Sequence, residues 1–198
     1  MGALLAISRV IDAINFRIGK WLSWLILVAV IVSATNAVVR KLFDTSSNAW
    51  LELQWVLFGI VFLLCSPWTL MSNEHIRIDI VNNMFPRTVR NWIDVVGHAF
   101  FLLPLTIIMI ITSAPFFWRS FQIGEQSMNA GGLAQWPSKG VVLVGFFLLF
   151  LQGISELIKR IAVMLGRIPD PYGSGGGHLS AAEAEAARLL AELNAEKR

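Results

Sequence analysis

The sequence predicts an all-α integral membrane protein with four transmembrane helices, an N-terminal amphipathic helix and a short soluble C-terminal helix. Of its 198 residues, 56% are hydrophobic and only 15% are charged, whereas soluble domains carry about 25% charged residues. The apolar residues gather in stretches near or above the roughly 20 residues with which a helix crosses a bilayer. Because lipid offers the backbone no hydrogen-bonding partners, such stretches are expected to be helical. They are Trp21–Val39, Trp50–Met71, Trp92–Trp118 and Gly140–Leu165.

Residues 1–20 show the periodicity of an amphipathic helix, in which apolar side chains recur every three or four residues. These are Leu4, Ile7, Ile11, Ile14 and Ile18, with Arg9, Asp12 and Arg17 between them. Beside a membrane, such a helix is expected to lie in the interface with its apolar face down, or to extend the first span. Packing on a partner helix is a further alternative that the pattern alone does not separate from these.

Residues 21–168 form the predicted membrane domain. Ala29, Ser33 and Ala37 place small side chains on one face of the first span, which allows helix backbones to approach closely in lipid. Pro67 is expected to bend or end the second helix because it lacks a backbone N–H. Pro104 predicts a kink in the third span.

The fourth span carries Glu156, with Lys159 and Arg160 three and four residues further on. This spacing favours ion pairs along a helix. Beyond the span, residues 169–179 are rich in Pro and Gly and read as a linker. The capping box Ser180-Ala181-Ala182-Glu183 then predicts a short cytoplasmic helix over residues 180–198.

The basic residues predict the orientation, because cytoplasmic flanks carry the excess of Lys and Arg. The N-terminal flank, the second loop and the C-terminal flank hold most of them: Arg9, Arg17, Lys20, Arg77, Arg87, Arg90, Lys159, Arg160 and Arg167. The first and third loops hold Arg40, Lys41, Arg119 and Lys139. Both termini are therefore expected in the cytoplasm.

The sequence carries no catalytic motif, and we expect no enzyme activity, no cofactor, no metal and no nucleic-acid partner. No cluster has zinc spacing, and neither a phosphate-binding loop nor a nucleophile elbow occurs. One alternative is a redox membrane anchor with haem between His75 and His98. Another is a stand-alone channel, which would need ionisable groups deep in the spans. The candidates Glu52, Asp94, Arg119 and Glu156 instead fall near span ends.

Several motifs in order resemble the small membrane subunit, or Q subunit, of tripartite ATP-independent periplasmic (TRAP) transporters. Glu52 begins the second span, His75-Ile76-Arg77-Ile78-Asp79 follows it, and Pro86 precedes the third span. The third loop contains Gly124-Glu125-Gln126-Ser127, and later Gly132-Leu133-Ala134-Gln135-Trp136-Pro137 leads into the fourth span. The resemblance covers about Trp21 to Ile161.

The resemblance implies a scaffold subunit of a sodium-driven importer of organic acids. Its partners would be a large membrane subunit that moves the substrate, a periplasmic substrate-binding protein and membrane lipids. On the outer side, Glu52, Gly124, Glu125, Gln126 and Ser127 would dock the binding protein or brace the structure. On the inner side, His75, Arg77 and Asp79 would brace the second loop or bind lipid headgroups.

Overall fold

The computed structural model describes residues 2–44, 47–72 and 86–168. This part of the chain contains four helices long and apolar enough to span a membrane, which confirms the predicted fold class. The first two are α1 (Gly2–Phe43) and α2 (Asn48–Met71). The third is built from α4 (Arg87–Val96), a π-helical segment η1 (Gly97–Leu102) and α5 (Leu103–Gln122), and the fourth is α6 (Trp136–Met164).

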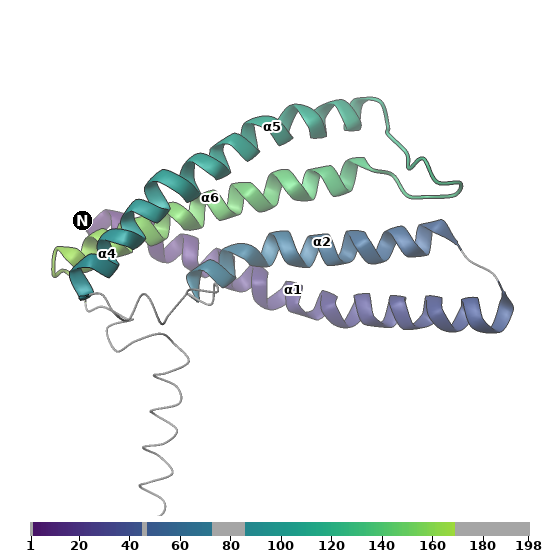
Figure 1. Cartoon of the computed structure of the whole chain (residues 1–198), viewed down its shortest axis with the longest axis horizontal. Helices are drawn as coiled ribbons and strands as arrows, with labels where there is room; N and C mark the ends of the chain where they lie inside the picture. Colours follow the sequence, from purple (N-terminus) through teal and green to yellow (C-terminus); the bar gives the residue numbers. More distant parts are fainter. Residues whose placement is uncertain (1, 45–46, 73–85, 169–198) are drawn as a thin grey trace, which may run out of the picture.

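The helices lie side by side in the order α5, α6, α2, α1 (Figure 1). Helix α6 packs against α5, α2 and α1, and it also contacts α4. The end of α1, the start of α2 and the connection α5–α6 lie at one end of this layer, and the start of α1 lies at the other (Figure 1). We call the first end the outer end and the second the inner end, after the orientation that the basic residues predict.

The amphipathic N-terminal segment and the first span form one continuous helix of 42 residues. At 1.5 Å per residue its length is about 63 Å, roughly twice the hydrocarbon thickness of a bilayer. Of the alternatives for residues 1–20, the structure shows the extension of the first span. Ser8 and Asn15 on this extension are buried, whereas Leu4, Ile7 and Ile14 are exposed. The polar face therefore turns toward the rest of the chain.

The contacts between helices are largely polar or small. Among the described residues, the buried apolar side chains are Leu57, Leu70 and Ala162, whereas many polar ones are buried. On α5, the buried residues Thr106, Ser113 and Ser120 follow one another at intervals of seven. Polar and small contacts are expected where lipid covers the outside, because apolar burial then gives no net drive for helix association.

Two glycines of α6 set its distance from its neighbours. A Cβ added at Gly145 would lie 2.9 Å from the Leu63 side chain of α2. A Cβ at Gly153 would lie 3.2 Å from the side chains of Leu102 and Leu103. The absence of a side chain at these positions therefore allows α6 to approach both neighbours closely.

Pro67 and Pro104 affect the hydrogen bonding of their helices differently. Pro67 is buried inside α2, and the helix continues past it to Met71. The π-helical segment ends at Leu102, two residues before Pro104, and the Leu103 N–H bonds to the carbonyl of His98 five residues back. The hydrogen-bonding irregularity thus lies next to Pro104, where the sequence predicts a kink. Thr106 Oγ1 donates to the Leu102 carbonyl at 3.0 Å.

Candidate functional site

The connection between α5 and α6 at the outer end, residues 123–135, is an ordered hairpin that we call the outer loop. The Ser127 N–H donates to the Leu133 carbonyl at 3.0 Å, and the Gln135 N–H donates to the Glu125 carbonyl at 2.9 Å. Gln126 and Ala134 face each other as an antiparallel bridge. The backbone of the outer loop is therefore paired across its two arms.

The tip of the outer loop is a turn over residues 129–132. The Gly132 N–H donates to the Asn129 carbonyl at 3.0 Å. Gly131, at the third position of the turn, has φ of 70°, a left-handed conformation that glycine adopts without a steric penalty. This glycine lets the chain reverse within four residues.

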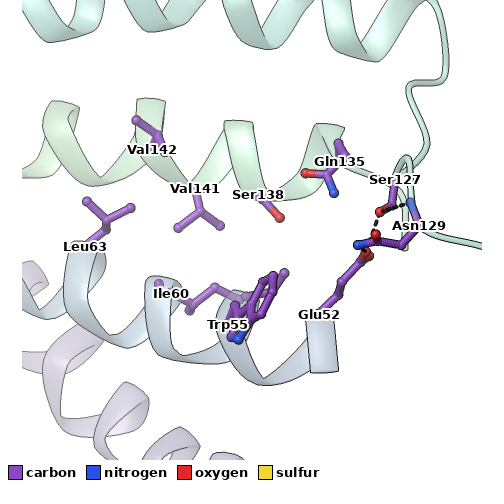
Figure 2. Close-up of a pocket in the computed structure, with 12 residues that line it drawn as sticks. Glu52, Trp55, Ile60, Leu63, Ser127, Asn129, Gln135, Ser138, Val141 and Val142 are labelled. Carbon is purple, nitrogen blue, oxygen red and sulfur yellow. Dashed lines mark hydrogen bonds between the residues drawn. The ribbon is translucent and has the colours of Figure 1, made fainter. Parts of the chain in front are cut away.

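Glu52, near the start of α2, holds the outer loop through hydrogen bonds. Its side chain is buried with 5% exposure, and its carboxylate accepts three hydrogen bonds from the loop. The donors are the Ser127 hydroxyl, the Asn129 amide at 2.8 Å and the Leu133 N–H at 2.6 Å. Figure 2 shows the Glu52 carboxylate directed at Ser127 and Asn129. Hydrogen bonds to an ionised acceptor are stronger than neutral ones, so Glu52 is an anchor for the loop.

The space beside the Glu52 carboxylate leaves no room for a side chain at position 132. A Cβ at Gly132 would lie 2.5 Å from the Ser127 Cβ and 2.7 Å from Glu52 Oε1. Such distances are shorter than van der Waals contact, so any larger residue would displace the hydrogen-bonded pair. Two motif residues, Gly132 and Glu52, are therefore both needed for the hydrogen bond between Glu52 and Ser127.

Two further contacts fasten the outer loop to the helix ends. The Asn48 amide at the start of α2 donates to the Ala130 carbonyl at 3.0 Å. Glu125 pairs with Lys139 in the first turn of α6, and the Lys139 ammonium lies 3.9 Å from the centroid of the Phe116 ring. The Lys139 ammonium lowers the pKa of the Glu125 carboxyl below its ordinary value of 4.5, so this carboxyl is ionised at neutral pH.

A cavity of about 380 Å³ lies between the outer halves of α2 and α6, beneath the outer loop. Glu52, Ser127 and Gln135 line its polar end, and Ile60 and Leu63 line its apolar part (Figure 2). The cavity thus passes from polar to apolar lining with distance from the loop.

At the inner end, a second polar group joins α1 to α6. We call it the inner polar cluster, and its members are Ser8, Asp12, Asn15, Gln152, Ser155, Glu156 and Lys159. The Ser8 and Ser155 hydroxyls are 2.7 Å apart, and the Asn15 amide donates to the Gln152 side-chain oxygen at 2.7 Å.

Asp12 is the centre of the inner polar cluster. It accepts from Gln152 and Ser155, each at 2.8 Å, and pairs with Lys159 at 3.0 Å. Lys159 also pairs with Glu156 at 2.5 Å, as the helix spacing predicts. A charged group on the N-terminal extension is therefore neutralised by α6.

Arg160 has a different partner from the one that the helix spacing favours. Its guanidinium lies 3.0 Å from the Asp94 carboxylate on α4, so it ties the start of the third span to α6. One turn after Asp94, His98 is buried and its Nδ1 lies 2.6 Å from the Asp94 carbonyl oxygen. The other histidine of the haem alternative, His75, lies outside the described residues.

The structure brings together five of the eight candidate site residues at the outer end: Glu52, Gly124, Glu125, Gln126 and Ser127. His75, Arg77 and Asp79 lie outside the described residues, as does the predicted C-terminal helix. Sequence reasoning missed Asn48 and Asn129, for which no motif gives a signal. Within the described part of the chain, no group of three or more His, Cys, Asp and Glu is placed to hold a metal ion.

Four membrane-length helices in one layer, joined by polar contacts, define a multi-pass helical membrane protein. The model of the DctQ component of tripartite ATP-independent periplasmic transporters matches residues 17–163. The chain therefore belongs to this family and is the small membrane component of a TRAP transporter, in agreement with the resemblance seen in its motifs. Comparison with curated proteins and with solved structures gave no match.

Proposed function

We propose that this chain is the scaffold subunit of a sodium-coupled TRAP importer of organic acids. In this proposal it packs beside the large membrane subunit and helps to dock the periplasmic substrate-binding protein. Both termini lie in the cytoplasm, and the outer loop faces the periplasm. Membership of the DctQ family carries the proposal. Sodium coupling and carboxylate substrates follow from the resemblance to Q subunits.

The contacts of the ionisable groups support a scaffold. The buried carboxylate of Glu52 is engaged by the outer loop, and the buried Glu156 and Arg160 pair with Lys159 and Asp94. Glu52 and Arg160 therefore brace one element against another, and Glu156 is neutralised by Lys159 within α6. A transport pathway would instead need groups free to exchange partners with a moving ion or substrate.

The outer loop supports the docking role. It stands at the predicted periplasmic end, and its backbone is fixed by Glu52, Asn48 and the Glu125–Lys139 pair. A loop held in one conformation loses little conformational entropy when a partner binds. We propose that Gly124, Glu125, Gln126 and Ser127 contribute to this docking surface. Glu52 would position them through its hydrogen bonds to the outer loop.

Co-purification tests the proposal first. The tagged chain is extracted from its native membrane in mild detergent, and the bound chains are identified by mass. We expect a stoichiometric, larger multi-span protein. A chain that purifies alone, or with a haem- or flavin-bearing partner and a Soret band, would refute the scaffold function.

Reconstitution then tests the transport. Proteoliposomes that hold both membrane subunits should take up a carboxylate when the loaded binding protein and an inward sodium gradient are present. Collapse of the sodium gradient should abolish uptake. Uptake that persists without sodium would refute the sodium coupling. The scaffold role would then be judged by the co-purification experiment alone.

A further inference from the structure

We propose that Met128, at the tip of the outer loop, is an apolar anchor that inserts into a pocket of the periplasmic binding protein. This inference rests on the proposed function. Met128 is the most exposed large apolar side chain of the described residues, with a relative exposure of 105%. Met128 is therefore not packed against the described part of this chain and is available to a partner.

The residues on both sides of Met128 are held by hydrogen bonds. The residues that precede and follow it, Ser127 and Asn129, both donate to Glu52 Oε1. The Asn129 N–H also donates to the Ser127 hydroxyl at 3.1 Å. Met128 is thus held between two residues that share one buried acceptor. Its presentation to a partner costs little backbone entropy, which is the condition under which a protruding side chain contributes most to binding.

The surroundings of Met128 favour a protein pocket over a lipid surface. Its neighbours Gln126, Ser127 and Asn129 are polar, and residues 130–132 are Ala and Gly. A loop that enters lipid would have to bring these peptide and amide groups with it, at a high desolvation cost. A protein pocket can accept the methionine alone and leave the polar residues hydrated at the rim, as in the usual anatomy of an interface.

Methionine suits such a role because its unbranched thioether side chain adapts to irregular apolar pockets. In the proposed function, the binding protein docks on this loop and leaves it again in each transport cycle. One adaptable anchor with a polar rim favours an interface that forms and dissociates, whereas a broad apolar patch favours a permanent one.

The test measures the affinity of the loaded binding protein for the two-subunit complex in lipid nanodiscs. Met128→Ala removes the anchor and Met128→Gln replaces it with a polar side chain of similar length. Both are expected to weaken binding by about 10- to 100-fold, the range for a truncated interface anchor. Leu42→Ala is the matched control, because Leu42 is also an exposed apolar residue (71%) at the outer end. This variant should bind as the unchanged complex does.

A fluorescence measurement separates a protein pocket from lipid. Cys65 is the only cysteine of the chain, so Cys65→Ser with Met128→Cys allows an environment-sensitive dye to be placed at the tip. The dye should report water in the nanodisc alone and an apolar environment after the binding protein is added. An apolar signal without the binding protein would place the tip in lipid and overturn the proposal.

The affinity results distinguish this inference from the function on which it rests. If the unchanged complex binds the loaded protein and both Met128 variants bind equally well, the anchor is refuted and the docking function stands. If the unchanged complex does not bind the loaded protein, the docking function fails and the anchor fails with it.

Discussion

At the scale of single residues, the hydrogen bonds of Glu52 lead us to expect that this side chain keeps the outer loop ordered. We expect Glu52→Gln to release the loop, although the side-chain shape is kept. A carboxylate accepts on both oxygens, and Glu52 uses both, one for Ser127 and Asn129 and the other for Leu133. An amide can offer only one acceptor, so its NH2 group would meet an N–H donor.

The release of the loop is measurable by hydrogen exchange. The Leu133 amide should exchange at least about tenfold faster in the Glu52→Gln variant, because its acceptor is lost. Asp44→Asn is the control, since Asp44 is an exposed acidic residue near the same end, where φ is 52° and Asn is tolerated as well as Asp. Equal exchange in the two variants would show that Glu52 does not hold the loop.

Gly132→Ala should disturb the same arrangement through shape instead of charge. The new methyl group would overlap the Ser127 side chain and a Glu52 oxygen, and we expect about the same faster exchange at Leu133. Gly59→Ala is the matched change, because a Cβ at Gly59 meets nothing within 4 Å. That variant should leave the loop unchanged and favour its helix slightly. An ordered loop in Gly132→Ala would mean that the hairpin can shift without losing the anchor.

At the scale of elements, the spans could be predicted from the sequence, because lipid imposes one requirement on every spanning segment. The course of residues 1–20 could not be predicted, since the same periodicity fits a helix in the interface, an extended span or a partner contact. The structure shows that its polar face is the one buried, on Gln152 and Ser155. The hydrogen bonds of Glu52 could not be predicted for another reason. The residues that bond to Glu52 lie 75 or more residues away along the chain.

The packing of the N-terminal extension on α6 can be tested by a disulfide. In a Cys65→Ser background, Ser8→Cys with Ser155→Cys should cross-link on mild oxidation, because the two hydroxyls are 2.7 Å apart. The control pair is Ser33→Cys with Ser155→Cys. Ser33 lies 25 residues further along the same helix, about 38 Å away by the helical rise, and should not cross-link. A failure of the first pair to form a bridge in the membrane would show that the extension leaves α6.

At the scale of the whole molecule, the flat arrangement of helices leaves large apolar faces without cover from this chain. Exposed residues run along α1, α2 and α5, among them Trp24, Phe62 and Ile111. Apolar side chains on these faces are expected to contact lipid and, in the proposed complex, the large membrane subunit. This layered shape is compatible with the proposed scaffold role, in which the chain enlarges the membrane part of the complex.

We propose that the outer half of α1 is a surface that the large subunit contacts. Ser33 and Ala37, one turn apart, are exposed and no helix of the described chain covers them, although small side chains at this spacing favour close helix contact in lipid. We expect Ser33→Leu with Ala37→Leu to reduce co-purification of the large subunit by about tenfold, because bulky side chains would hold the two backbones apart.

The matched control for this prediction is Val30→Leu with Val38→Leu, which also adds volume on exposed positions of α1 but not at the small residues. The control should retain the large subunit. In both variants the Ser8–Ser155 cross-link would report whether α1 is still packed on α6. If the large subunit is retained equally by both pairs, while the cross-link forms, then the large subunit binds a different face of the layer, and the exposed side of α5 becomes the surface to test.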